Sequence, residues 1–73
     1  MPTTPTETVV SAAHAVLARS SVSELRQIRV DEHANELQLH GKVRSFYHKQ
    51  LAQEAVRPVA MGLRVVNHLD VTT

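Results

Sequence analysis

Five histidines are the residues whose side chains could most readily do chemistry: His14, His33, His40, His48 and His68. Imidazole is a common metal ligand, but no two of these residues have the spacing that places a ligand pair on one face of a helix. The chain contains no cysteine, and no cluster of carboxylates completes a ligand set. Asp31–His33 is expected in a turn, where neighbouring side chains point in different directions. We therefore predict no metal site and expect solvent-facing histidines.

The sequence also lacks a catalytic constellation. Its serines fall at expected connections and at one expected helix cap, and none stands in the glycine pattern of a nucleophile elbow. Glu32, His33 and Glu36 are near one another only because a turn is expected between them. Gly41 and Gly62 each stand alone, so no glycine-rich loop could hold a phosphate. We predict a protein without catalytic activity and without a cofactor.

A short stretch, "GKVRSFYHK", combines cations with the only phenylalanine and tyrosine of the chain. Lys42, Arg44 and Lys49 could reach phosphates, and an aromatic ring among cations suits the surface of an anionic membrane. The helical spacing places Phe46 away from the centre of the apolar helix face. Phe46 therefore either packs sideways against the sheet end or the first helix, or is exposed.

The length and composition indicate one small domain. The 73 residues can build a single thin core, which must be aliphatic because aromatic residues are scarce. A formal charge of +1 gives no global attraction to nucleic acid or membrane, so any such binding needs a local patch. The first ten residues lack the pattern of a secretory signal, and no segment approaches the roughly twenty apolar residues that span a bilayer. We expect a soluble chain.

The first element that could position these side chains is a helix over about residues 5–19. The motif "TPTE" offers a cap, a proline for the first helical position and the glutamate of a capping box. Val9, Ala13, Val16 and Leu17 then recur on one helical face. We expect residues 1–4 to form a disordered tail and residues 5–72 to form one domain.

A hairpin should follow the helix. Ile28 and Val30 alternate with polar residues as in a half-buried strand, although Leu25 is out of phase with them. The polar turn "DEHAN" comes next, and Asn35 is the residue expected to adopt a left-handed backbone. Residues 36–43 alternate strictly between apolar and polar, which predicts a strand with one buried face.

A second helix and a last strand complete the pattern. Ser45 is the expected cap, and Pro58 should end the helix. The apolar arc of this helix is expected to face the core, and it consists of Tyr47, Leu51, Ala52, Ala55, Val56 and Val59. A turn at Gly62 then leads to a last strand in which every second residue is apolar. Val66 and Asn67 interrupt this alternation, as a β-bulge would.

The predicted fold class is α+β, as a single small αββαβ domain. Both helices have one apolar side, so we expect two helices packed on one face of a three-stranded mixed sheet. If the strands around the second helix run parallel, they form a right-handed crossover. The other sheet face should present Arg29, Gln38, His40 and Lys42 to water or to a partner.

The strand end and the last strand resemble the BON domain, a family named for bacterial osmotically inducible and nodulation proteins. That family typically has an apolar strand ending in Gly-x-Val, an alanine-containing helix and a closing strand that starts at a glycine. Leu63 replaces the usual valine after that glycine. The residues that match the family pattern are Gly41, Val43, Gly62, Val66, Asn67, Leu69 and Val71.

The resemblance covers about residues 7–72 and implies a non-catalytic module with the fold predicted above. It implies binding to phospholipid or membrane surfaces, or interactions among envelope proteins. Gly41, Gly62 and Asn67 would then serve backbone geometry rather than contact with a partner. The family suggests the periplasm or cell envelope, whereas the sequence as given, without a visible leader, also allows the cytoplasm.

We therefore expect a non-catalytic binding module that attaches to phospholipid or membrane surfaces through Lys42, Arg44, Phe46 and Lys49. The alternative is protein–protein interaction or self-association through an unpaired sheet edge or the exposed sheet face. Nucleic-acid binding is a distant third, because the chain has neither a Gly-x-x-Gly loop nor aromatic residues on its strands.

Overall fold

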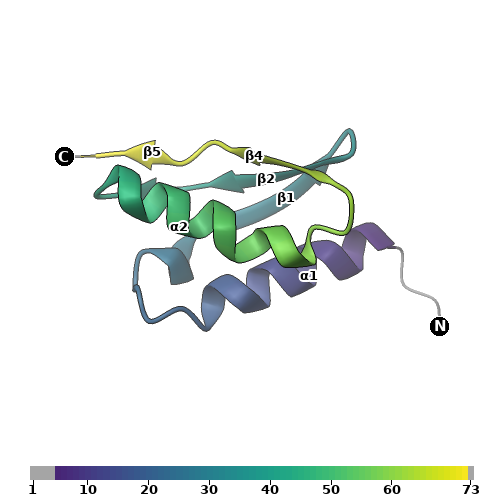
Figure 1. Cartoon of the computed structure of the whole chain (residues 1–73), viewed down its shortest axis with the longest axis horizontal. Helices are drawn as coiled ribbons and strands as arrows, with labels where there is room; N and C mark the ends of the chain where they lie inside the picture. Colours follow the sequence, from purple (N-terminus) through teal and green to yellow (C-terminus); the bar gives the residue numbers. More distant parts are fainter. Residues whose placement is uncertain (1–4, 73) are drawn as a thin grey trace.

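The computed structural model describes residues 5–72, with side chains from residue 9 onward (Figure 1). The predicted tail at residues 1–4 lies outside the described residues. So do the predicted cap Thr4 and the side chain of Glu7, the glutamate of the predicted capping box. Helix α1 spans Pro5–Ala18, close to the predicted bounds. Its buried side chains are Val9, Ala13 and Leu17, which recur every four residues and so lie on one face.

A short turn separates α1 from the sheet. The 3-10 helix η1 spans Leu25–Gln27 and buries Leu25, which is why this residue is out of phase with the strand that follows. Strand β1 begins only at Arg29 and spans Arg29–His33. Strand β2 spans Glu36–His40 and pairs antiparallel with β1, so the predicted hairpin is confirmed. Its turn is shorter than predicted, because Asp31–His33, which were expected in the turn, belong to β1 and pair with β2.

The hairpin turn has two residues with a left-handed backbone. Asn35 has a φ of 65°, as predicted, and Ala34 has a φ of 52°, which the sequence did not indicate. A two-residue turn with positive φ at both positions matches the twist of the flanking strands. The turn therefore fixes the register in which β1 pairs with β2.

Three further strands complete two parallel ladders. Strand β3 spans Lys42–Val43, β4 spans Arg64–Asn67, and β5 spans Asp70–Val71. The ladders pair β2 with β4 and β3 with β5. In the parallel ladders Leu37 pairs with Val65 and Val43 pairs with Val71, an offset of 28 residues in both cases. No extra residue is inserted between β4 and β5, so the predicted bulge is wrong. The three-stranded sheet has the order β1-β2-β4, and β3 and β5 form a separate two-stranded sheet beyond Gly41. The strand predicted at residues 36–43 and the predicted last strand are therefore each divided into two.

Helix α2 spans Phe46–Val56 and is followed by the 3-10 helix η2 at Arg57–Val59. The predicted cap is confirmed, because Ser45 Oγ accepts the N–H of His48 at 3.1 Å. Pro58 lies in η2, where the regular helix has already ended. A cap of this kind contributes about 1 kcal/mol to helix stability.

Both long helices cover one face of the sheet (Figure 1). The buried aliphatic side chains between them include Leu37 and Leu39 of β2, Val56 of α2 and Leu17 of α1. On the strands the alternate residues, which include Arg29, Gln38, His40 and Lys42, are exposed or half-buried. The predicted α+β arrangement, with two helices on one face of a mixed sheet, is confirmed.

Candidate functional site

The start of α2 is held to the rest of the fold by one carboxylate. Glu24 Oε1 accepts the backbone N–H of Arg44 at 3.1 Å and lies 2.8 Å from Nδ1 of His48. Its other oxygen is 3.7 Å from Nε of Arg44. The backbone hydrogen bond from Arg44 is the main cause that lowers the pKa of Glu24, and the hydrogen bond to His48 lowers it further.

Phe46 and Tyr47 project from this anchored helix start into solvent. Phe46 is 65% exposed and Tyr47 is 68% exposed. Of the two alternatives for Phe46, the structure therefore shows the exposed one. The expected burial of Tyr47 is wrong. Tyr47 lies five residues before the buried Ala52, which is roughly 140° around a helix of 3.6 residues per turn.

Two cations accompany these rings. The Lys49 ammonium lies 5.9 Å from the centre of the Phe46 ring, within the range of a cation–π contact. The Arg44 side chain is 86% exposed. We call these four residues, Arg44, Phe46, Tyr47 and Lys49, the aromatic–cationic patch.

Lys42, which the sequence grouped with these residues, belongs to a different surface. It lies in β3 and lines a hollow on the open face of the sheet, opposite the helices. The predicted four-residue site is therefore divided: the structure places Arg44, Phe46 and Lys49 at the start of α2 and Lys42 behind the sheet.

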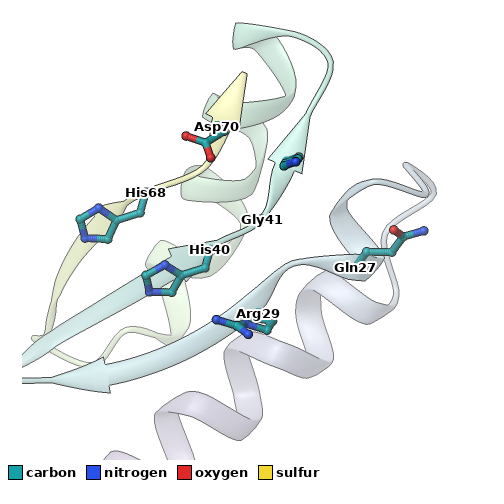
Figure 2. Close-up of a pocket in the computed structure, with 7 residues that line it drawn as sticks. Gln27, Arg29, His40, Gly41, His68 and Asp70 are labelled. Atoms are coloured by element: carbon teal, nitrogen blue, oxygen red, sulfur yellow. The ribbon is translucent and has the colours of Figure 1, made fainter. Parts of the chain in front are cut away.

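The hollow on the open sheet face has a volume of about 390 Å³ (Figure 2). The imidazoles of His40 and His68 stack in it, with ring centres 5.2 Å apart and planes 12° from parallel. His40 Nε2 also lies 3.7 Å from Oδ2 of Asp31. The residues that line the hollow are Gln27, Arg29, His40, Gly41, Lys42, His68 and Asp70.

Sequence reasoning missed this histidine pair. His40 and His68 differ by 28 residues, which is the offset of the parallel ladders on either side of them. The sequence does contain one signal, because both residues fall at polar positions of the alternating pattern in their strands. Their pairing could be inferred from this signal only once the register of the two strands was known. Among the described side chains no group of three or more metal-ligating residues could hold a metal ion.

Comparison with known proteins gives one family. The model of the BON domain matches residues 6–73. The chain belongs to the BON domain family. Comparison with curated proteins and with solved structures finds no match. BON domains are generally non-catalytic and are known as phospholipid-binding or membrane-associated modules. Within residues 5–72, no helix combines the length and the hydropathy of a membrane span.

Asn67, a residue of the BON pattern, ties α2 to the sheet where β4 ends. Its Nδ2 donates to the carbonyl of Lys49 at 2.8 Å and to Oε1 of Gln53 at 3.3 Å. Its Oδ1 accepts the N–H of Leu69 at 3.1 Å. Asn67 therefore keeps the alternation of the strand and faces the helix.

The two glycines of the BON pattern adopt backbone angles that other residues avoid. Gly41 has a φ of 148°, and a Cβ atom there would lie in ordinary van der Waals contact with Leu69 and Ile28 at 3.6–3.8 Å, so the backbone angle is what requires glycine. Gly62 has a φ of 87° in an open turn, where only the backbone requires glycine. The remaining pattern residues lie on the parallel strands: Val43 and Leu69 are buried, Val66 is half-buried and Val71 is 39% exposed.

Proposed function

We propose that this BON domain attaches to anionic phospholipid surfaces through the aromatic–cationic patch. The observation that carries this proposal is the exposure of Phe46 and Tyr47 at the first turn of α2. These are the only Phe and Tyr of the chain, and both are turned away from the core. An exposed ring beside cations suits a membrane surface, where the ring can enter the apolar acyl-chain region and the cations can contact the anionic headgroups.

The two kinds of side chain make separate contributions to such binding. A Phe side chain that leaves water contributes about 2 kcal/mol. A cation near an anionic membrane surface contributes about 1 kcal/mol, and this contribution decreases as salt screens it. Arg44 and Lys49 flank the rings, so rings and charges can reach the same surface.

The test is sedimentation with vesicles that contain phosphatidylserine, in comparison with vesicles of phosphatidylcholine alone. We expect Phe46→Ser to lower the partition coefficient roughly tenfold, because the apolar contribution of the ring is lost. Raising the salt concentration should weaken the binding of the wild type. Removing both rings, as in Phe46→Ser with Tyr47→Ser, should reduce binding further.

Met61 provides a matched control. It is a large apolar residue that is 72% exposed in the turn before β4, away from the patch. Met61→Ser removes similar apolar surface and should leave vesicle binding unchanged. Equal binding by wild type and Phe46→Ser, or equal losses in Phe46→Ser and Met61→Ser, would contradict the proposal.

The second candidate function is self-association or binding of a protein partner through a sheet edge. Strand β4 is the last strand in the order β1-β2-β4, so one side of it has no neighbouring strand among the described residues. A mass that rises with protein concentration in lipid-free buffer would favour this candidate. Vesicle binding by a protein of constant monomer mass would favour the membrane.

Because BON domains are associated with membranes, we propose the cell envelope as the compartment.

A further inference from the structure

The open face of the sheet carries its polar side chains in rows that run across the strands. Arg29 of β1 pairs in register with His40 of β2, and His68 stacks on His40 from the segment that joins β4 and β5. Figure 2 shows that the two imidazoles and the Arg29 guanidinium point the same way from neighbouring strands. Lys42 and Asp70 form the next row, across β3 and β5.

The side chains that line the hollow supply more hydrogen-bond donors than acceptors. Neither Arg29 nor Lys42 forms an ion pair with any side chain that the structure describes. Gln27 adds an amide from η1 at the rim. Asp70 is the single carboxylate among the lining residues. A hollow of about 390 Å³ has the size of a site for a small ligand and is open to solvent.

The charge of this site depends on the histidine pair. Arg29 and Lys42 are positive, and they are offset by Asp70 and by Asp31, which lies 3.7 Å from His40. With both imidazoles neutral these four charges cancel, and with both protonated the site carries a charge of +2. Two stacked cations repel each other, and an anion between them and Arg29 relieves that repulsion.

We propose that the open sheet face binds a doubly charged tetrahedral oxyanion, such as a sulfate or a phosphate monoester, between His40, His68, Arg29 and Lys42. Binding strengthens when the two histidines are protonated. This site is separate from the aromatic–cationic patch, and the sulfate titration that tests it contains no lipid. It can therefore succeed or fail independently of the proposed membrane attachment.

Sulfate is the probe, because its charge stays at −2 between pH 5.5 and 7.5 and any pH dependence must come from the protein. We expect the sulfate dissociation constant, measured by isothermal titration calorimetry at constant ionic strength in chloride, to be at least about tenfold lower at pH 5.5 than at pH 7.5. Titrations in buffers of different ionisation enthalpy should show that protons are taken up on binding.

Substitutions in the hollow should act in opposite directions. Asp70→Asn removes the one opposing carboxylate of the lining and should tighten sulfate binding several-fold, whereas Lys42→Gln should weaken it. His68→Gln removes one of the two imidazoles and should therefore reduce both the pH dependence and the proton uptake. The matched controls are His14→Gln on α1 and Arg64→Gln at the far end of the same sheet face, and both should bind as the wild type does. Far-UV circular dichroism checks that each variant is folded.

Three results would overturn the proposal: sulfate affinity that is equal at both pH values, no gain in Asp70→Asn, or a loss in His14→Gln equal to that in His68→Gln. Competition identifies the source of the anion. Displacement of sulfate by glycerol 3-phosphate indicates a soluble phosphate monoester. Displacement by phosphatidate vesicles, measured with the Phe46→Ser variant, indicates a lipid headgroup. Displacement by neither would contradict a phosphate ligand.

Discussion

At the scale of single residues, Glu24 connects the turn after α1 to the start of α2. It accepts the backbone N–H of Arg44 and contacts His48, and its side chain is 23% exposed. The same carboxylate thereby orients the segment that carries Phe46 and Tyr47. Loss of this contact should loosen the patch as well as the fold.

The lowered pKa of Glu24 predicts how its contribution to stability changes with pH. The ionised carboxylate is favoured in the folded state, so its contribution is complete above the unfolded-state pKa of about 4.5. The contribution is lost as pH falls through the lower folded-state value. The free-energy difference between wild type and Glu24→Gln, from urea unfolding, should therefore be larger at pH 7 than at pH 3. An equal difference at both pH values would show that the ionised carboxylate is not what stabilises this contact.

Tyr47 shows where helical spacing misleads at the residue scale. Tyr47, Leu51 and Ala55 succeed one another every four residues, which looks like one apolar stripe. In the structure Leu51 and Ala55 are half-buried at the rim of the interface, and Ala52 and Val56 are at its centre. The pattern identified the correct side of the helix but not its centre, because the centre depends on how α2 is rotated against the sheet.

At the scale of elements, the turn between β1 and β2 holds an alanine in an unfavourable conformation. Ala34 has a φ of 52°, and a left-handed backbone costs an L-residue other than glycine roughly 1 kcal/mol. We therefore expect Ala34→Gly to raise the free energy of unfolding by about 0.5–1 kcal/mol, measured by urea denaturation with circular dichroism.

The same substitution elsewhere provides the control for this prediction. Ala15 is exposed within α1, where glycine lowers stability by about 1 kcal/mol. Ala15→Gly should therefore be destabilising while Ala34→Gly is stabilising. Destabilisation by both substitutions would show that the backbone of Ala34 is not strained.

Most elements could be predicted because their local patterns agree with their tertiary roles. The alternation of residues 36–43 and the cap at Ser45 depend on chain neighbours alone. The cap is confirmed, and the burial alternates as predicted, although Gly41 divides the expected strand into β2 and β3. Asn67 could not be understood in this way. Its partners, Lys49 and Gln53, lie 18 and 14 residues away on α2, so a polar residue in an apolar strand looked like an interruption.

At the scale of the whole molecule, the start of α2 and the hairpin turn lie at opposite ends of a long particle (Figure 1). The principal extents are 43 × 23 × 16 Å. Attachment through the aromatic–cationic patch would therefore hold one end at the membrane and keep the turn at Ala34 and Asn35 in water. The absence of cysteine allows single labelled cysteines to test this orientation.

A spin label at Gln50, an exposed residue of α2 near the patch, should become less accessible to a water-soluble nickel relaxant when vesicles are added. A label at Ala34 should keep its accessibility, because the turn stays in water. Electron paramagnetic resonance measures both. Protection of Ala34 without protection of Gln50 would mean that the molecule binds in the reverse orientation.

The candidate sites could be predicted only in part, because some of their residues are distant in the chain and meet only in the folded molecule. Phe46 with Arg44 and Lys49 is a local cluster, so the sequence could identify it. The pairing of His40 with His68 depends on two strands that meet only after the crossover through α2. Lys42 lies on the open sheet face with His40, as the alternation of residues 36–43 predicted, although it is four residues from Phe46 in the chain.

The exposure of Tyr47 also gives the protein its own optical probe. The chain has no tryptophan and a single tyrosine, so nearly all of its near-ultraviolet emission comes from the patch. Quenching by iodide should be efficient in buffer and should decrease on vesicles that bind the domain. For the same reason this emission should change little on unfolding, because the phenol ring is already in water in the folded state. Tyrosine emission therefore reports contact with a membrane and leaves folding to circular dichroism.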